Sequence, residues 1–158
     1  MINSSDIIPN IELRAIKDDG VKIINTHKYF SLKKILIICI PGAFTSTCHN
    51  QHLPPFILGL EKLYSQKNFD EVCCIASNDP IILELWRNEF KNPRITFISD
   101  GNLEFATKTG LIKDYEKSFM GKRIKRCVLT MSNLKITNIF VDESGLNQSS
   151  FENVYSNI

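Results

Sequence analysis

The sequence predicts an α/β protein with a mixed central sheet, helices on both faces of that sheet, and an N-terminal β-hairpin. Short apolar runs of strand length alternate with segments of helical periodicity through the middle of the chain. A final pair of strands then precedes one more helix near the C-terminus. With 158 residues, of which 43% are hydrophobic and 23% charged, the chain is long enough for one sizeable core. We therefore predict a single domain over residues 1–158.

The first half of the chain predicts a hairpin, a buried strand and an interrupted helix. Alternating stretches in Ile7–Ile24 flank an Asp-Asp-Gly turn, which favours a β-hairpin, and Asn25–Lys33 is expected to be a connector. The unbroken apolar run in Lys34–Ile40 is typical of a central strand. Apolar residues recur at helical spacing in Cys48–Lys67, but the pair Pro54-Pro55 predicts that the helix is kinked or restarts after Leu53.

The second half continues the alternation and then changes to a hairpin. Asp79 and Pro80 form a cap and a first turn, and Gly110 stops a short helix. We expect strands over Val72–Ala76 and Arg94–Ile98, helices over Pro80–Phe90 and Leu103–Thr109, a strand pair over Arg126–Met131 and Lys135–Val141, and a last helix capped by Ser149 or Ser150. This order of elements is the one that the thioredoxin-like architecture uses.

The predicted elements are organised around Cys48, at the point where the central strand gives way to a helix. Pro41 and Gly42 end the strand, a polar turn follows, and Cys48 opens the helix. Unpaired backbone N–H groups and the positive end of the helix dipole favour a thiolate there, and the thiolate is the reactive form of cysteine. We interpret Cys48 as the working residue, although a cysteine after a strand is also commonly a small buried hydrophobe.

The neighbours of Cys48 can support such chemistry. Pro41 fixes φ and has no N–H, so it can shield a thiolate without donating to it. Thr45 can turn its hydroxyl toward the thiol, or it can simply cap the helix. A nearby cation is also needed, and the candidates are Lys122, Arg123, Lys125, Arg126, His49 and His52. His52 lies four residues after Cys48 and would share its face on an unbroken helix, but it is also read as a structural histidine.

The bulk composition excludes several other classes of function. A formal net charge of +2 argues against a nucleic-acid or membrane-surface partner, and no apolar run approaches the roughly 20 residues of a spanning helix. The five cysteines are too irregularly spaced for a disulfide framework or a zinc site, so Cys39, Cys73 and Cys74 are expected in the core. A reducing compartment and no visible targeting segment lead us to expect a cytoplasmic protein.

The turn before Cys48 resembles the signature of a known family. The run Pro41-Gly42-Ala43-Phe44-Thr45-Ser46-Thr47-Cys48 fits the peroxiredoxin pattern Pro-x-x-x-Thr-x-x-Cys. Further stretches resemble the peroxiredoxin-5-like subgroup, and the resemblance runs from about Ile7 to Asn157; these stretches are His52-Leu53-Pro54, Asn78-Asp79, Trp86 and Phe119-Met120-Gly121-Lys122-Arg123.

The resemblance implies a thioredoxin-like fold and a thiol-dependent peroxidase without metal or organic cofactor. Cys48 would be the peroxidatic cysteine that becomes a sulfenic acid, and Thr45 would orient the peroxide. Pro41 would shield the nucleophile, and Arg126 would be the active-site arginine that stabilises developing charge. Hydrogen peroxide, organic hydroperoxides and peroxynitrite would be the substrates, and this subgroup commonly forms dimers that pack near the active site.

Three departures from the family pattern matter. The segment Gly145–Ser149 lacks the resolving cysteine that some relatives carry after a Gly-Leu pair. We therefore predict a one-cysteine enzyme whose sulfenic acid is reduced by an external thiol such as glutathione, glutaredoxin or thioredoxin. Cys127 stands where an aromatic residue is usual, either as a core substitution or as an unusual resolving thiol. Ser46 and Thr47 replace a more usual pair without altering the required positions of the motif.

Two other functions compete with the peroxidase. A cysteine hydrolase would use Cys48 with His52 as its base and would need an oxyanion site. A non-catalytic peroxide sensor would instead act through oxidised Cys48 on a partner protein. We favour the peroxidase because the signature, the turn and a placeable arginine agree.

Overall fold

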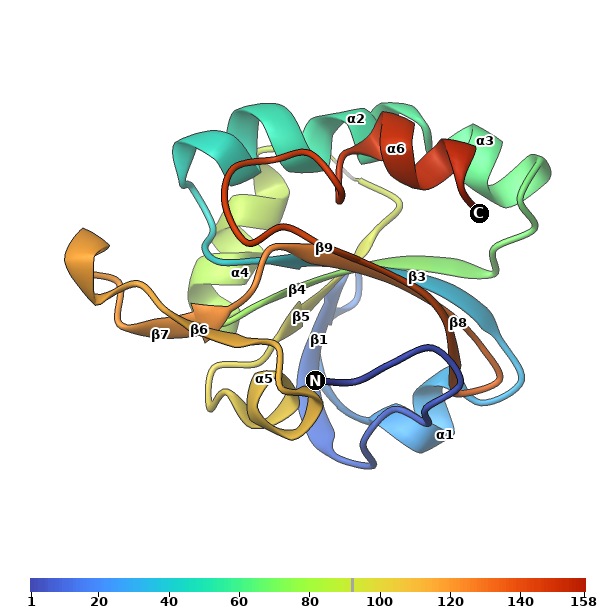
Figure 1. The fold of residues 1–158 in the computed structure, drawn as a ribbon, viewed down its shortest axis with the longest axis horizontal. Helices are drawn as coiled ribbons and strands as arrows, with labels where there is room; N and C mark the ends of the chain where they lie inside the picture. The colour runs from blue at the N-terminus through green and yellow to red at the C-terminus, as the bar shows by residue number, and fades with distance from the viewer. Residues whose placement is uncertain (92) are drawn as a thin grey trace.

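A computed structural model describes residues 1–91 and 93–158, and a mixed seven-stranded sheet forms its centre (Figure 1). Its strands are β1 (Glu12–Lys17), β2 (Gly20–Asn25), β3 (Lys34–Ile40), β4 (Glu71–Ala76), β5 (Thr96–Ser99), β8 (Cys127–Ser132) and β9 (Lys135–Val141). They lie in the order β2-β1-β5-β4-β3-β8-β9. β3, β4 and β5 run parallel, whereas the N-terminal hairpin and the β8–β9 pair extend the sheet antiparallel on either side. The predicted mixed sheet and N-terminal hairpin are confirmed.

Helices cover both faces of this sheet, as Figure 1 shows. They are α1 (Thr26–Phe30), α2 (Leu53–Leu58), α3 (Leu60–Ser65), α4 (Pro80–Asn88), α5 (Glu104–Thr109) and α6 (Phe151–Ser156). The core on one face includes side chains from α1 and α5, and the core on the other includes side chains from α2, α3, α4 and α6. Together with the strand order, this arrangement is the predicted thioredoxin-like fold.

Strand β3 divides the two cores because successive side chains of a strand point to opposite faces. Ile35, Ile37 and Cys39 lie in the core between the sheet and helices α1 and α5, which we call the lower core. Leu36, Ile38 and Ile40 lie in the core between the sheet and helices α2, α3, α4 and α6, which we call the upper core. A strand buried on both faces is a near-continuous apolar run, as its sequence predicted.

The helix after β3 is interrupted at the predicted place. A π-helix over Cys48–His52 is followed by α2, whose first turn contains Pro54. Proline lacks the N–H of a continuing helix and fits the first turn of a new one, so the hydrogen-bond pattern changes there. The predicted kink or restart after Leu53 thus corresponds to the change from π- to α-helix at His52–Leu53.

One local prediction differs from the structure, and a second hairpin was not predicted. The expected connector over Asn25–Lys33 contains α1, a single turn whose N-terminus is capped by Asn25 accepting from Lys28 N. A five-residue helix is too short to show helical periodicity, so only its cap marks it. A second hairpin, β6 (Ile112–Asp114) paired with β7 (Lys122–Ile124), was not predicted because three-residue strands show too little alternation.

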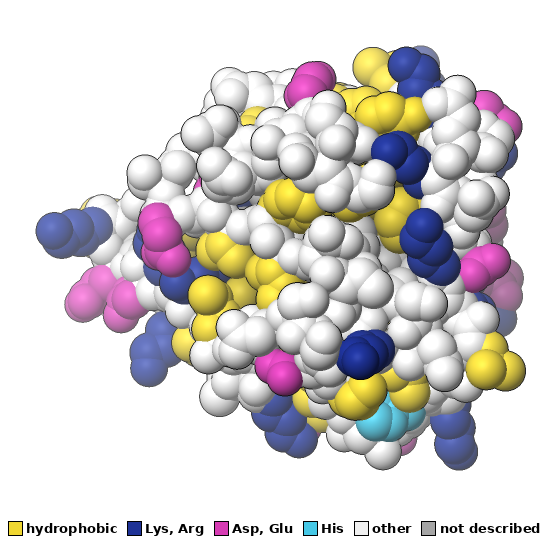
Figure 2. Space-filling model, turned by 45° about the vertical axis from the view of Figure 1, so that its right-hand side comes forward, with side chains coloured by type: hydrophobic (Ala, Val, Ile, Leu, Met, Phe, Trp, Pro, Cys, Tyr) yellow, Lys and Arg dark blue, Asp and Glu magenta, His cyan; other side chains and the backbone are white. Residues whose placement is uncertain are grey.

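The surface mixes charges of both signs. On the face in Figure 2, basic and acidic side chains alternate with hydrophobic ones. Among residues 1–91 and 93–158, no helix combines the length and apolar character needed to cross a membrane.

Candidate active site

Cys48 lies where the turn after β3 enters the π-helix. Its side chain is fully buried in the upper core, and Pro41 at the beginning of the turn is also buried. Thr45 is partly exposed, and its carbonyl accepts from His49 N, so the turn is already tied to the helix. Three of the four predicted site residues, Pro41, Thr45 and Cys48, therefore lie on one short segment.

Close packing explains the glycine in this turn. A Cβ on Gly42 would lie 3.1 Å from the Met120 methyl carbon and 3.2 Å from the Thr45 methyl carbon. The turn is also fixed from behind, because Ala43 N donates to Asn78 Oδ1 at 2.8 Å. Asn78 follows β4 and Met120 lies in the β6–β7 loop, so two segments remote in sequence hold the turn that leads to Cys48.

The Thr45 hydroxyl has a defined role in the resting structure. It donates to the Gly42 carbonyl oxygen at 2.8 Å. A hydroxyl that donates to one group still has lone pairs with which to accept from another. In this state the Thr45 oxygen can accept a hydrogen bond from a protonated oxygen of a substrate. To donate a hydrogen bond to a substrate, the hydroxyl would have to rotate away from Gly42.

Arg126 precedes β8 and contacts His52 from the π-helix. Its Nη1 lies 3.1 Å from His52 Nδ1, and His52 Nε2 lies 3.0 Å from the Ser149 carbonyl oxygen. Burial and then the charge of Arg126 lower the pKa of His52 to about 4. Both ring nitrogens of this fully buried histidine are therefore engaged away from Cys48. A Cys48–His52 pair of the hydrolase type is disfavoured by this geometry.

Tyr115 follows β6 and is partly buried. Burial raises the pKa of the Tyr115 hydroxyl, the positive charge of Arg126 opposes that shift, and Cys48 adds to it. Two of the other cations considered from sequence have other partners: Lys125 pairs with Glu143 at 2.8 Å, and Arg123 Nε donates to the Met120 carbonyl.

An aromatic cluster borders the other side of Cys48. Trp86 Nε1 donates to His49 Nδ1 at 2.8 Å, and the His49 ring stacks on Phe44 with 6.1 Å between centroids. Trp86 itself is fully buried against Phe97 and Phe90. The single tryptophan thus contacts the residue that follows Cys48, which makes its fluorescence a probe of this helix turn.

The remaining cysteines divide between the two faces of the sheet. Cys73 lies in the lower core and Cys74 in the upper, as expected for neighbours on a strand. Cys127 is fully buried in the lower core opposite Cys39 of β3, and burial followed by the neighbouring Cys127 raises the pKa of the Cys39 thiol. Cys48 lies in the upper core, so Cys127 is separated from it by the sheet. This position favours the interpretation of Cys127 as a core substitution.

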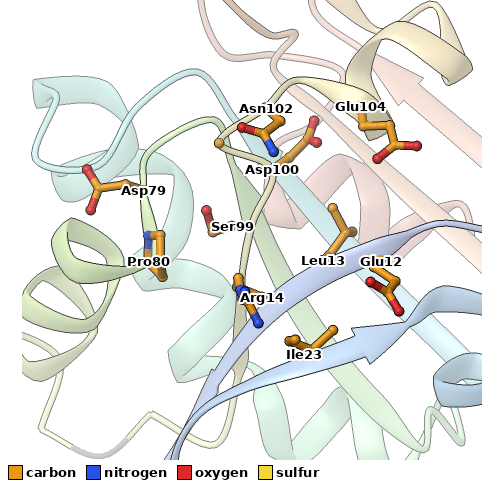
Figure 3. A pocket seen from close by; sticks show the side chains of 11 residues that line it. Glu12, Leu13, Arg14, Ile23, Asp79, Pro80, Ser99, Asp100, Asn102 and Glu104 are labelled. Carbon is orange, nitrogen blue, oxygen red and sulfur yellow. The ribbon is translucent and has the colours of Figure 1, made fainter.

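A distinct pocket of about 480 Å³ lies beside β1 and the carboxyl end of β5 (Figure 3). Asp79, Asp100 and Arg14 line it together with other polar residues. Two of its acidic groups already have structural roles: Asp79 caps α4, and Asp100 accepts from the backbone N–H groups of Phe105 and Ala106. Burial raises the pKa of Asp100 against those hydrogen bonds. The residues of the predicted site are not among its lining residues, so this pocket is separate from Cys48.

Sequence reasoning missed several residues around Cys48. Asn78 and Met120 were noticed only as parts of a resemblance, and Tyr115 and Asp142 were not noticed at all. Their contacts join the loops after β4, β6 and β9 to the turn and to Arg126, and no spacing along the chain encodes such contacts. Among the described residues, no group of three or more His, Cys, Asp or Glu side chains could hold a metal ion.

Comparison with known proteins gives consistent relatives. Residues 3–155 match the Redoxin family. Peroxiredoxin-2D of Arabidopsis thaliana is 32% identical over 146 residues, which cover 91% of this chain and 90% of that protein. A crystal structure described as Plasmodium falciparum antioxidant protein, a one-cysteine peroxiredoxin, is 30% identical with a TM-score of 0.93, covering 98% of this chain and 97% of the other. Reduced Prx3 of Vibrio vulnificus in complex with hydrogen peroxide is 26% identical with a TM-score of 0.92, and each chain is 99% covered.

Proposed function

Since this chain belongs to the peroxiredoxin family, and is thus a thiol-dependent peroxidase, we propose that it works with one redox cysteine, Cys48, reduced by an external thiol. The observation that carries this proposal is the position of Cys48. It begins a helix after the Pro41–Thr45 turn, and Arg126 contacts His52 of the same helix. Hydrogen peroxide, organic hydroperoxides and peroxynitrite are the proposed substrates.

The proposed first step transfers one oxygen atom to sulfur. The Cys48 thiolate attacks one peroxide oxygen, the O–O bond breaks, and the other oxygen leaves with its electron pair, taking up a proton to give water or an alcohol, or leaving as nitrite when the substrate is peroxynitrite. Cys48 becomes a sulfenic acid, the reversible first stage of thiol oxidation. Arg126 supplies a positive charge for the thiolate and for the negative charge that develops on the leaving oxygen.

Thr45 and Pro41 have complementary roles in this proposal. The Thr45 oxygen, whose own proton is directed to Gly42, accepts a hydrogen bond from the protonated peroxide oxygen and so orients it. Pro41 is buried beside the turn and offers no N–H, so it excludes water without donating a proton.

The second step removes the sulfenic oxygen as water. An external thiol, from glutathione, glutaredoxin or thioredoxin, attacks the Cys48 sulfur and forms a mixed disulfide as water leaves. A further thiol then attacks the sulfur of the reductant in this mixed disulfide, which releases Cys48 as a thiol and joins the two reductant sulfurs in a disulfide. Two observations support a one-cysteine cycle: Gly145–Ser149 contains no cysteine, and Cys127 lies in the opposite core from Cys48. The related Plasmodium falciparum structure is itself described as a one-cysteine peroxiredoxin.

We also propose a homodimer that packs near this site. Phe44 of the turn is 50% exposed, and Ile81 and Leu85 of α4 are 69% and 55% exposed. Large apolar side chains exposed near one another are typical of a contact surface. Sedimentation at several protein concentrations, with Leu85→Glu as the disrupting variant, tests this part of the proposal separately.

Stopped-flow oxidation of the reduced protein by hydrogen peroxide tests the enzyme cycle. Trp86 fluorescence follows the reaction, mass spectrometry identifies the product, and Cys48→Ser and Cys127→Ser are the paired variants. We expect rapid sulfenic acid formation in the wild type and in Cys127→Ser, none in Cys48→Ser, and reduction on addition of an external thiol.

Other outcomes have defined meanings. An internal disulfide, to Cys127 or to Cys74 in the same core as Cys48, would overturn the one-cysteine cycle alone. A sulfenic acid that no external thiol reduces would favour the peroxide sensor. Oxidation no faster than that of free cysteine would contradict the role of Cys48.

A further inference from the structure

His52 occupies an unusual place for a titratable side chain. It is fully buried in the helix that begins with Cys48, and each of its ring nitrogens faces one polar partner. Nδ1 faces the Arg126 guanidinium at 3.1 Å, and Nε2 faces the Ser149 carbonyl oxygen at 3.0 Å. The peroxide chemistry described above uses neither nitrogen directly.

The two partners fix the tautomer of this ring. An arginine side chain can only donate hydrogen bonds, so Nδ1 must accept. A backbone carbonyl oxygen can only accept, so Nε2 must carry the hydrogen. The imidazole is therefore neutral, and the lowered pKa of His52, which results from burial and from Arg126, agrees with this assignment. Protonation of Nδ1 would replace its acceptor with a donor that faces another cation.

The acceptor carbonyl is itself held in place. The Asp142 carboxylate accepts from Asn147 N, Gln148 N and Ser149 N, and also from the Ser149 hydroxyl at 2.6 Å. These hydrogen bonds lower the pKa of Asp142 although its burial opposes the shift. Asp142 N in turn donates to the Arg126 carbonyl at 3.0 Å. The contacts thus form a closed path from the Arg126 guanidinium through His52, Ser149 and Asp142 to the Arg126 backbone.

A neutral acceptor has a particular value for Arg126. A carboxylate would also orient the guanidinium, but it would cancel much of the positive charge. No ion pair among the described residues includes Arg126. Held by an uncharged ring, Arg126 keeps its charge for the thiolate and the breaking O–O bond.

We propose that His52 is a positioning residue for Arg126, and that the Asp142–Ser149 loop sets the orientation of His52 and through it of the guanidinium. This inference rests on the proposed function, since it assumes that Arg126 acts on the peroxide at Cys48. It also gives the C-terminal segment a role in a chain whose Gly145–Ser149 stretch contains no cysteine.

Two substitutions separate the two contacts of the ring. In His52→Asn the side-chain oxygen takes the position of Nδ1 and can still accept from Arg126, whereas the contact to Ser149 is lost. In His52→Gln the amide nitrogen reaches the position of Nε2 and can still donate to Ser149, whereas the acceptor for Arg126 is lost. The measured quantity is the second-order rate constant for oxidation of Cys48 by hydrogen peroxide.

We expect His52→Asn, which keeps the acceptor for Arg126 but loses the contact to the loop, to lower the rate by less than about 10-fold, and His52→Gln, which loses the acceptor, to lower it by roughly 10- to 100-fold, because misplacing a charged group by about 1 Å can reduce a rate by that much. A faster His52→Gln than His52→Asn would show that only the loop contact matters and would overturn the proposal. Equal rates for the two variants would overturn it as well.

A second background distinguishes positioning from a general structural effect. In Arg126→Met, His52→Gln should cause no further loss of rate, because the group that it positions is absent. Should His52→Gln fail to fold, Asp142→Asn serves instead: it places an amide donor against Ser149 N and should slow the wild type but not Arg126→Met. A loss of the same size in both backgrounds would contradict the proposal.

The proposed function and this inference fail in different ways. A wild-type Cys48 that reacts no faster than free cysteine contradicts the proposed function before any variant is compared. A fast wild type with the wrong order of His52 variants contradicts the positioning role alone.

Discussion

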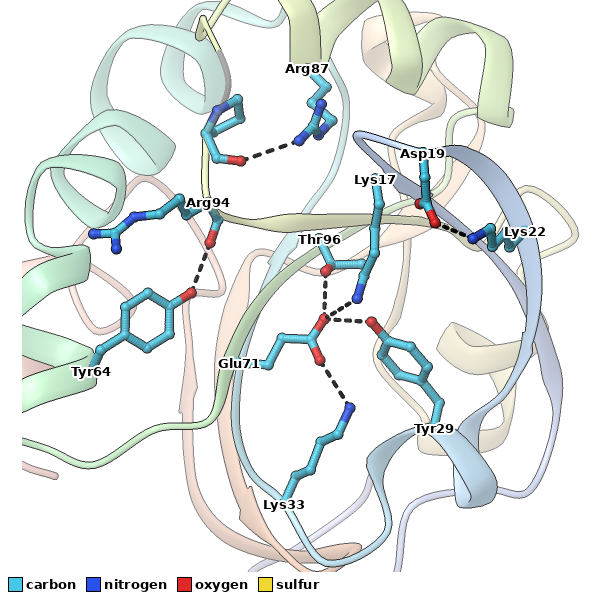
Figure 4. Close-up of polar contacts among 11 residues, drawn as sticks. Lys17, Asp19, Lys22, Tyr29, Lys33, Tyr64, Glu71, Arg87, Arg94 and Thr96 are labelled. Atoms are coloured by element: carbon cyan, nitrogen blue, oxygen red, sulfur yellow. Dashed lines mark hydrogen bonds and ion pairs between the residues drawn. The ribbon is translucent and has the colours of Figure 1, made fainter.

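Two polar clusters lie at opposite ends of β3, and they use buried charge in opposite ways. The Glu71 cluster, at the beginning of the strand, comprises Glu71, Tyr29, Thr96, Lys17 and Lys33 (Figure 4). The His52 network, at its end, comprises His52, Arg126, Ser149 and Asp142. The first surrounds its central charge with partners, whereas the second leaves its arginine charge without an ion-pair partner among the described residues.

The Glu71 cluster is saturated. Tyr29 and Thr96 donate to Glu71 Oε1, and Lys17 and Lys33 pair with the carboxylate at 3.3 and 3.2 Å. Burial alone would raise the pKa of Glu71, but the two hydroxyl donors and two ammonium groups outweigh burial and lower it. Burial also raises the pKa of Tyr29 to about 12, so this hydroxyl remains a donor. Such a cluster ties β1, α1 and β5 to β4 and offers little to a ligand.

Under the proposed function, this difference separates an end of the sheet that serves stability from an end that serves chemistry. A buried charge that is fully paired exerts a weak field on its surroundings, and removing one of its partners destabilises the fold. A charge held by a neutral acceptor stays available to a reacting group. The following changes test this contrast, beginning with the largest expected effect.

Replacing the unpaired charge should reduce activity far more than stability. We expect Arg126→Met to slow oxidation of Cys48 by peroxide about 10²- to 10³-fold, the usual effect of removing one electrostatic donor. The free energy of unfolding should fall by only about 1 kcal/mol, because one half-buried hydrogen bond is lost. Stopped-flow kinetics and urea unfolding measure the two quantities. A loss of stability as large as the loss of activity, when both are expressed as free energies, would contradict the division of roles. Arg126→Lys keeps the charge but not the planar donor, so its rate of Cys48 oxidation should lie between those of wild type and Arg126→Met.

Acidification should weaken the fold through His52. Its pKa is about 4 in the folded protein against 6.5 for the ordinary side chain, so between these values the unfolded chain binds the proton and the folded one does not. Stability is therefore complete above about pH 6.5 and is lost as the pH falls toward 4, by roughly 3 kcal/mol from this group. Urea unfolding at several pH values measures the free energy of unfolding, and His52→Asn should lose roughly 3 kcal/mol less than wild type as the pH falls from 6.5 to 4. Parallel slopes for the two proteins would contradict the assignment.

Neutralising the saturated cluster should have the reverse outcome. Glu71→Gln keeps one acceptor oxygen but loses the charge that holds Lys17 and Lys33, so the free energy of unfolding should fall by about 2 kcal/mol. The peroxide rate constant should stay within about 2-fold of wild type, since the cluster lies at the far end of β3 from Cys48. A loss of rate comparable to that of Arg126→Met would show that the two ends are coupled.

Removing one donor from the same cluster should give the smallest change. Tyr29→Phe deletes the hydrogen bond to Glu71 and keeps the ring against Phe30, so we expect a loss of about 1 kcal/mol in unfolding free energy and no change in rate. Thermal unfolding of this variant beside Glu71→Gln gives the comparison. A Tyr29→Phe loss larger than that of Glu71→Gln would show that the Tyr29 hydroxyl, and not the carboxylate charge, contributes most to the stability of this cluster.

The sequence by itself determined the order of the main elements and one segment of the candidate site. The apolar run Lys34–Ile40, the turn with Pro41 and Thr45, and Cys48 after it are all local patterns, because strand, turn and helix start are encoded by neighbouring residues. The resemblance to the peroxiredoxin family rested mainly on the same short segment, and the match of residues 3–155 to the Redoxin family shows the membership. The one-turn helix α1 and the β6–β7 hairpin were missed because elements of this length show no measurable period.

Only the tertiary structure decided what surrounds the thiol. His52 was first considered as a partner of Cys48 because of its spacing, but the π-helix and the loop around Ser149 turn its ring toward Arg126 and the Ser149 carbonyl. Cys127 was open to two interpretations until the alternation of β8 placed it on the other side of the sheet from Cys48. Contacts between residues that are 74 or 97 positions apart depend on how the sheet brings its loops together, and no local pattern records that.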